Sequence, residues 1–206
     1  MNILAIGAHP DDIEVGCGGT LAKYARGGHE IYLLVMTEGS KGGKADIRKK
    51  EQVRSAKLLK PREMIWGSYK DTLLTPHMNR MVHDIETVLK KIVPDFIFVH
   101  YEDDTHQDHR ALAKATVSAT RYVRNVIFFE GPTTQNFAPT LFVDIRETID
   151  EKFAMLLAHR SQVRKTNIEG LSITDVVRST AVFRGIQGRV PYAEAFVPLR
   201  LFINVT

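Results

Sequence analysis

Two short polar segments of the chain carry the residue types that can do chemistry. The first is Ala8-His9-Pro10-Asp11-Asp12, which follows an apolar run at the start of the chain. The second is His100-Tyr101-Glu102-Asp103-Asp104-Thr105-His106-Gln107-Asp108-His109, which directly follows a later apolar run. Imidazole and carboxylate ligands without thiolate suit zinc or another divalent transition metal. Two histidines and one carboxylate leave a position for water, which is the ligand set of a catalytic zinc site.

Each segment alone has a plainer explanation. A His-Pro pair at the end of a strand is usually a turn, and an acidic loop is usually solvated surface. Two such segments at one edge of a sheet favour a site, because converging titratable groups mark functional clefts. We therefore expect a metal site where the two segments meet.

The elements that position these segments follow from the apolar pattern. Buried strands are predicted at residues 2–7, 31–36, 64–66 and 96–99, and helices at residues 19–26, 45–59 and 78–92. Strands that alternate with helices predict a doubly wound, Rossmann-like α/β fold, with a mostly parallel sheet and helices on both faces. Ligands bind such sheets beyond the carboxyl ends of the strands, where both polar segments begin.

The later part of the chain has a less regular pattern. It predicts a helix after His109, strands at 126–129 and 141–143, a helix at 147–159 and a final strand at 195–203. No repeat or linker divides the sequence, so we expect a single domain over residues 1–206. Residues 1–120 would form the core that carries the metal segments, and residues 121–206 would shape the pocket.

The composition excludes several classes of protein. The chain has 206 residues, and 28 basic against 24 acidic side chains leave a net charge of +4. This excess is spread along the chain without aromatic partners, so no nucleic-acid partner is expected. The single cysteine, Cys17, excludes a disulfide within the chain and a cysteine-rich zinc module. With no signal peptide and no apolar run of about 18 residues, we expect a cytoplasmic protein without a membrane span.

At these segments the sequence resembles the LmbE-like, or PIG-L, zinc-dependent N-acetylglucosaminyl deacetylases. The resemblance covers most of the chain and is firmest at Ala8–Asp12 and His106-x-x-His109. Weaker matches are Ile47-Arg48-Lys49-Lys50-Glu51, His159-Arg160-Ser161-Gln162 and Ala193-Glu194-Ala195-Phe196. The family commonly has His-Pro-Asp-His where this chain has Gln107 in the second position. The metal and acid positions survive, so we expect altered rigidity of the loop and no loss of activity.

The resemblance implies roles for several residues of the two segments. His9, Asp12 and His109 would bind Zn²⁺, and Asp11 would be the general base. The adjacent carboxylates suit this division, because neighbouring loop residues can point in different directions, one at the metal and one past it. The same ligand types also accept iron, cobalt or manganese.

Further roles are implied at the edge of the site. His106 would stabilise the oxyanion or donate a proton to the departing amine, with Asp108 orienting it. Arg48 and Asp71 match positions that contact substrate in the family, although an exposed helix-surface arginine is an equally good reading of Arg48. His100, at the end of a predicted strand, is a candidate to hold a ligand carboxylate.

The function that these residues predict is hydrolysis of an acetamide. The leading hypothesis is a zinc hydrolase that removes the acetyl group from an N-acetylated amino sugar and releases acetate and a free amine. One alternative is a zinc amidase acting on a thiol conjugate or an antibiotic-like glycoside. Another is a metal-bound but inactive sugar-binding protein, which would have no need for the base. The resemblance also suggests a homo-oligomer, a trimer or a hexamer.

Overall fold

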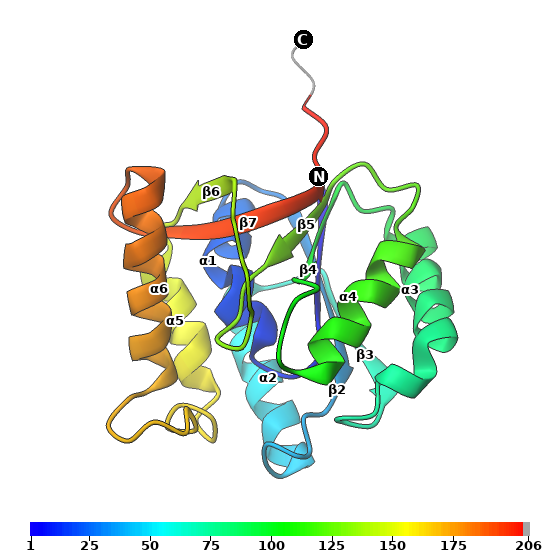
Figure 1. The fold of residues 1–206 in the computed structure, drawn as a ribbon, viewed down its shortest axis with the longest axis horizontal. Coiled ribbons are helices and arrows are strands. Elements are labelled where there is room, and N and C mark those ends of the chain that lie inside the picture. Colours follow the sequence, from blue (N-terminus) through cyan, green and yellow to red (C-terminus); the bar gives the residue numbers. More distant parts are fainter. Residues whose placement is uncertain (204–206) are drawn as a thin grey trace.

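A seven-stranded sheet forms the centre of the computed structural model, which describes residues 1–203 (Figure 1). The strands are β1 (Asn2–Gly7), β2 (Glu30–Thr37), β3 (Glu63–Tyr69), β4 (Phe96–His100), β5 (Val126–Phe129), β6 (Leu141–Asp144) and β7 (Ala193–Arg200). Their order across the sheet is β3-β2-β1-β4-β5-β7-β6. The first five pair in parallel, and β7 runs antiparallel to both of its neighbours. The predicted doubly wound, mostly parallel sheet is confirmed.

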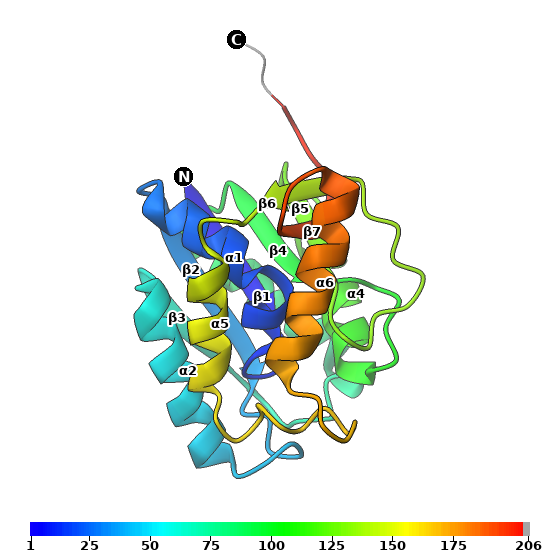
Figure 2. The ribbon, with the colours of Figure 1, turned by 90° about the vertical axis from the view of Figure 1, so that its left-hand side faces the viewer.

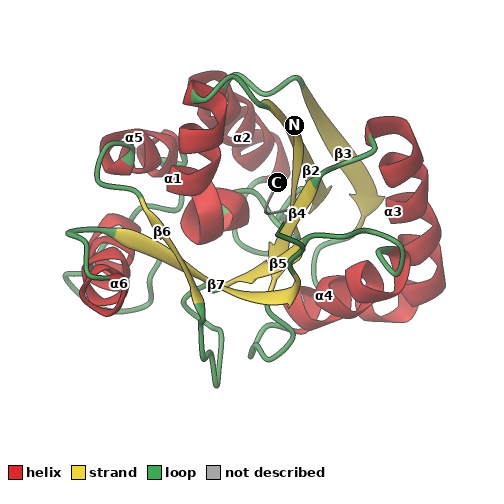
Figure 3. Cartoon of the chain, turned by 90° about the horizontal axis from the view of Figure 1, so that it is seen from above, coloured by secondary structure: helices red, strands yellow, loops and turns green. Residues whose placement is uncertain are grey.

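Helices cover both faces of this sheet. They are α1 (Asp12–Arg26), α2 (Ala45–Leu59), α3 (Met78–Ile92), α4 (Gln107–Ala119), α5 (Ile149–Ala158) and α6 (Ile173–Gly188), with a short 3-10 turn, η1 (Thr75–His77). The helices α3 and α4 lie on one face, and α1, α2 and α5 lie on the other (Figure 3). The helix α6 packs against α5, β6 and β7 (Figure 2). Among the described residues, no helix is both long and apolar enough to cross a membrane.

Burial on both faces explains the uninterrupted apolar strands of the sequence. In β1, Leu4 and Ile6 join the core beneath α3 and α4, whereas Ile3 and Ala5 join the core beneath α1 and α2. Successive side chains of a strand point to opposite faces, so a strand covered on both sides needs apolar residues at every position.

The helix α1 differs from its prediction at its start. It begins at Asp12 and not at Gly19, and its backbone leaves helical geometry at Cys17, where φ is −144° and ψ is 16°. The predicted helix therefore corresponds to the second half of a kinked helix. Three glycines surround Cys17, and glycine disfavours a helix interior, so the pattern before Gly19 did not indicate a helix.

An ion pair from the later part of the chain closes this kink. The Glu194 carboxylate of β7 accepts the N–H groups of Gly19 (2.8 Å) and Thr20 (2.7 Å). The Lys152 ammonium of α5 donates to Glu194 and to the carbonyl oxygen of Val15 (2.7 Å). One carbonyl oxygen of the first half of the helix and two N–H groups of the second half are thus capped by the two members of the pair.

The helix α6 is absent from the sequence-based prediction. Its apolar side chains do not follow one face, since Val182, Phe183 and Ile186 are exposed in the structure. A signal was present in the capping box, where Ser172 accepts the Asp175 N–H and Asp175 accepts the Ser172 N–H. The other corrections are small: α5 covers 149–158, β3 extends to Tyr69, and the last strand ends at Arg200.

Candidate metal centre

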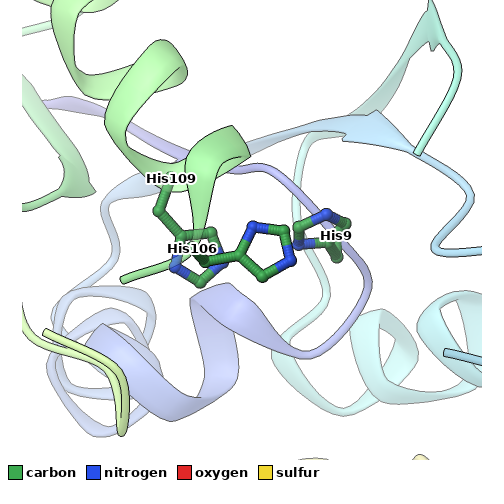
Figure 4. Close-up of side chains that lie close together, drawn as sticks. All are labelled: His9, His106 and His109. Atoms are coloured by element: carbon green, nitrogen blue, oxygen red, sulfur yellow. The ribbon is translucent and has the colours of Figure 1, made fainter. Parts of the chain in front are cut away.

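The two polar segments meet at the point where the order of the strands reverses. β1 lies between β2 and β4, so the connections after β1 and after β4 leave in opposite directions and open a crevice at the carboxyl ends. His9 follows β1, and the segment around His106 leads from β4 into α4. The rings of His9, His106 and His109 gather there (Figure 4). Ring centroids lie 4.7 Å apart for His9 and His106 and 4.6 Å apart for His106 and His109.

The Asp12 carboxylate lies between the two histidines predicted as ligands. Its Oδ2 atom is 3.3 Å from His9 Nδ1 and 3.5 Å from His109 Nε2. The same oxygen is 3.0 Å from His100 Nε2, and the His100 ring stacks on His109 with a centroid distance of 3.9 Å. The two nitrogens of the predicted ligand set thus approach one oxygen. His100, the last residue of β4, lies against the same oxygen.

The other nitrogen of His9 faces two carboxylates. His9 Nε2 is 3.1 Å from Asp71 Oδ1 and 3.3 Å from Asp108 Oδ2. Asp108 is held in place because it accepts the backbone N–H groups of Thr72 (2.7 Å) and Leu74 (3.1 Å). The family resemblance implies that Asp108 orients His106, whereas the Asp108 carboxylate lies against His9. A histidine whose one nitrogen faces a carboxylate presents the other to a metal, which leaves Nδ1 of His9 on the side of Asp12.

His109 is backed in the same way. Its Nδ1 atom lies 3.2 Å from Asp104 Oδ2, and Asp104 also accepts the His106 N–H (2.8 Å) and the Thr134 hydroxyl (3.0 Å). Burial by itself would lower the pKa of His109, but Asp12 and Asp104 outweigh it and raise the pKa to about 9. Asp104 was not among the candidate residues, although it stands in the acidic stretch that precedes His106.

The cluster contains more negative charge than the protein neutralises. Asp71, Asp104 and Asp108 are buried and Asp12 is half-buried, and within residues 1–203 none of these carboxylates is paired with a lysine or arginine. Burial would lower the pKa of His9, yet Asp12 and its neighbours hold that pKa well above its ordinary value. Buried carboxylates that attract protons to histidines suit a divalent cation, which supplies the same positive charge. The residues present therefore fit a metal ion.

Asp11 is turned away from this cluster by its backbone. Its φ of 87° and ψ of −22° lie in the left-handed region, which residues with a side chain rarely adopt. The carboxylate lies 3.1 Å from Arg48 Nη2. Burial raises the pKa of Asp11 to about 6, although Arg48 and His159 act in the opposite direction. The two adjacent carboxylates of the segment thus point at different partners, as the predicted division between ligand and base requires.

Arg48 and Asp71 both bind groups of the protein itself. Arg48 is 5% exposed and donates to the carbonyl oxygens of Pro10 (2.7 Å) and Gly39 (2.9 Å), so it is not an exposed helix-surface arginine. Asp71 is also buried and accepts the Lys41 N–H at 2.7 Å, besides facing His9. The predicted substrate contacts of both residues stay predictions.

His106 is the N-cap residue of α4, and its own hydrogen bond determines its tautomer. Its Nδ1 atom accepts the Asp108 N–H at 3.2 Å. A neutral ring with this arrangement carries its proton on Nε2. Burial lowers the pKa of His106, with His9 and His109 acting in the same direction, which favours the neutral ring.

Comparison with family models assigns residues 4–120, more than half of the chain, to PIG-L, described as GlcNAc-PI de-N-acetylase. The chain belongs to the PIG-L family. Its sequence is 36% identical over 167 residues to a protein of Escherichia coli described as the uncharacterized deacetylase YaiS, covering 77% of this chain and 90% of that protein. It is 26% identical to the diacetylchitobiose deacetylase of Thermococcus kodakarensis, covering 98% of this chain and 85% of that protein.

A solved structure has the same fold. The conserved protein TT1542 from Thermus thermophilus superposes with a TM-score of 0.87 and is 28% identical, covering 98% of this chain and 96% of the other. The likeness extends through the later part of the chain, which the family model does not reach. Membership of a family with deacetylases among its relatives and the predicted α/β fold are thus both shown.

The pocket of this PIG-L family member is built from segments that lie far apart in the sequence. Its lining includes Asp11, Asp12, His100 and His109 of the two polar segments, together with Val15, Phe129, Gly131, Pro132, Gln162, Lys165, Thr166 and Ile173. The loop that carries Gln162 is tied to α2, because Glu51 accepts the N–H (2.8 Å) and the hydroxyl (2.6 Å) of Ser161. Glu51 and Ser161 were noted only as part of the family resemblance, since nothing in their local pattern indicates a pocket.

Two other residues with reactive or ligating side chains lie outside the cluster. Cys17 is a buried free cysteine in the kink of α1 and takes no part in the groups that could hold a metal. His159 ends α5 and is buried beside Glu14, with 3.4 Å between Nε2 and Oε1, and it does not line the pocket.

Proposed function

We propose that this PIG-L family member is a zinc-dependent N-deacetylase that hydrolyses the acetamide of an N-acetylated amino sugar and releases acetate and a free amine. The observation that carries the proposal is the position of Asp12 Oδ2 within 3.5 Å of His9 Nδ1 and His109 Nε2. His9, Asp12 and His109 would hold the ion, and Asp71, Asp104 and Asp108 would orient the two rings.

A bound zinc ion would supply Lewis acidity, which lowers the pKa of a water toward about 7 and polarises a carbonyl group. The protein's own residues would move the protons. Asp11, with a pKa of about 6, is ionised at neutral pH and would accept a proton from the attacking water. It would then return that proton to the departing amine nitrogen.

His106 would act on the acetamide oxygen. Because its Nδ1 atom is occupied by the Asp108 N–H, the Nε2–H of the neutral ring is the group left to donate to that oxygen as negative charge develops. A donor that is already oriented needs no rearrangement during the reaction, so this contact would favour the transition state over the substrate.

The substrate class rests on the names of the relatives. The family is described by a de-N-acetylase of GlcNAc-PI, and the relative from Thermococcus by its action on diacetylchitobiose. Both names contain an N-acetylated glucosamine, which supports an amino-sugar acetamide as the substrate of this chain. A thiol-conjugate or glycoside amidase would use the same site, so only a survey of substrates separates the two. The trimeric or hexameric assembly stays a prediction.

The proposal is tested on freshly purified protein by elemental analysis together with an assay of amine release. The substrates are N-acetylglucosamine, its 1-phosphate and N,N'-diacetylchitobiose, each with and without a chelator. About one zinc per chain and chelator-sensitive release of amine would support the proposal. Bound zinc without turnover of any sugar would favour the amidase or the inactive binding protein. Absence of binding after zinc is supplied would contradict the metal centre itself.

A further inference from the structure

Two polar side chains of α2 form hydrogen bonds with one peptide group of the Ala8–Asp12 segment, which is called the metal segment below. Arg48 and Gln52 stand one helical turn apart, and both side chains are buried. Arg48 Nη2 donates to the Pro10 carbonyl oxygen at 2.7 Å, and Gln52 Oε1 accepts the Asp11 N–H at 3.0 Å. These two backbone groups belong to the same peptide, so α2 binds it at both ends.

This peptide group leads into Asp11, whose backbone conformation is unfavourable. Asp11 has a φ of 87°, and unlike Lys60, Val93 and Arg189, which have positive φ where helices end, it directly precedes a helix. A side-chain-bearing residue keeps such a conformation only when its surroundings enforce it. Asp11 also stands between two of the proposed ligands, so relaxation of its backbone would change the distance between His9 and Asp12.

The Gln52 side chain is itself held in one orientation. Its Nε2 atom donates to Glu14 Oε1 at 2.7 Å, and the residue is 0% exposed. Because a carboxylate needs a donor, the amide nitrogen must face Glu14 and the amide oxygen must face Asp11. Ser55, one turn further along α2, donates to the same Glu14 oxygen at 2.6 Å, and among the described residues no hydrogen bond joins its side chain to the Ala8–Asp12 segment.

We propose that Gln52 is a positioning residue of the metal centre. Its amide oxygen holds the Pro10–Asp11 peptide in the left-handed turn that brings His9 and Asp12 to one point and directs Asp11 past it. Gln52 does not line the pocket and contributes no group to the metal cluster. The inference deepens the proposed function, because it assumes that the cluster binds zinc.

The test compares Gln52→Met with Ser55→Ala by the affinity of the metal-free proteins for Zn²⁺, measured in competition with a chromophoric chelator. Both variants remove a buried hydrogen bond to Glu14, but only the first releases Asp11. Gln52→Met should weaken zinc binding by roughly tenfold to a hundredfold, the range found when groups behind metal ligands are removed. Ser55→Ala should change it by less than about twofold. Equal affinities for the wild type and Gln52→Met would overturn the proposal.

A second experiment tests whether Gln52→Met loses zinc affinity because the strained backbone of Asp11 relaxes. Glycine adopts a positive φ without penalty, so Asp11→Gly removes the conformation that Gln52 must enforce. Gln52→Met should then cost several-fold less zinc affinity in the Asp11→Gly background than in the wild type. An equal cost in both backgrounds would overturn the inference. If Gln52→Met folds only in the Asp11→Gly background, that result also supports the inference. If Gln52→Met folds in neither background, Gln52 is a structural residue only and the inference is wrong.

The two proposals fail in distinguishable ways. If the wild-type protein does not bind Zn²⁺, the proposed function fails at the metal centre. If the wild type binds Zn²⁺ and Gln52→Met binds it equally well, the metal centre stands and only the role of Gln52 is wrong. Neither result depends on finding the natural substrate.

Discussion

Two buried clusters of charged side chains, one around Lys152 and Glu194 and one around Asp12, differ in how completely their own members supply the hydrogen bonds and opposite charges that burial requires. The pair of Lys152 and Glu194 is complete, because the carboxylate accepts two backbone N–H groups and the ammonium, and the ammonium also reaches a carbonyl oxygen. In the described part of the chain, the carboxylates of the cluster around Asp12 have no lysine or arginine partner, and His100 Nδ1 has no hydrogen-bond partner.

This difference separates a structural cluster from a site that binds a ligand. A buried ion pair that completes its own hydrogen bonds has nothing left to offer, and its function is to shape the backbone around it. A cluster with surplus negative charge is costly unless something else supplies positive charge. The first half of α1 joins the two clusters, since Asp12 begins it and the ion pair closes it at the kink.

Removal of a proposed ligand is the most direct test of whether the cluster around Asp12 binds zinc. His9→Ala should reduce bound zinc from about one per chain to almost none, because it removes one of the two proposed imidazole ligands. Elemental analysis after dialysis against dilute zinc checks this, with His29→Ala as a control histidine outside the cluster. Retention of zinc by His9→Ala would contradict the proposed ligand set.

Removal of the proposed base should separate binding from turnover. Asp11→Ala should retain zinc but lose about 10²- to 10⁴-fold in kcat, the usual contribution of a general base. Steady-state kinetics on any sugar that the wild type deacetylates, together with the zinc content, check this. A variant with full zinc and full activity would rule out Asp11 as the base.

A substitution in the Lys152–Glu194 pair should lower the stability of the protein and leave zinc binding intact. Lys152→Met leaves Glu194 buried without its cation, so the free energy of unfolding should fall by about 3–5 kcal/mol while the folded protein still binds zinc. Urea unfolding in the presence of a chelator measures the stability, and a zinc titration of the folded variant measures the binding. An unchanged stability combined with lost zinc would assign the ion pair to the metal site.

Zinc should raise the free energy of unfolding only of those variants whose cluster around Asp12 is intact. At a free concentration about 100 times the dissociation constant, Zn²⁺ should raise the stability of the wild type by about 2.7 kcal/mol, because it binds the folded state alone. Lys152→Met should gain a similar amount, and His9→Ala should gain nothing. A thermal unfolding series with and without zinc gives all three results.

The smallest expected effect belongs to a helix end away from both clusters. Ser172→Ala removes the side chain that accepts the Asp175 N–H at the start of α6 and should cost about 1 kcal/mol. Zinc affinity should stay at the wild-type value. A loss of zinc affinity comparable with that of His9→Ala would show that the start of α6 is energetically coupled to the metal centre.

Much of the fold follows from local patterns. Apolar strands covered on both faces predicted β1, β2 and β4, and the amphipathic pattern predicted α2 and α3 with their observed bounds. The pattern did not indicate α6, whose exposed apolar residues blur its period, or the first half of α1, whose glycines weaken a helical interpretation. In both cases, contacts with distant parts of the chain stabilise a helix that local preference does not favour.

For the site, residue types and strand ends by themselves determined which side chains gather at the edge of the sheet. His9, Asp12 and His109 come together because parallel strands direct their carboxyl ends to one side. Only the tertiary structure decided which nitrogen of His9 faces Asp108, which amide holds Asp11, and which carboxylate closes the kink in α1. These contacts join residues far apart in the sequence, and their partners depend on side-chain directions that no local period encodes.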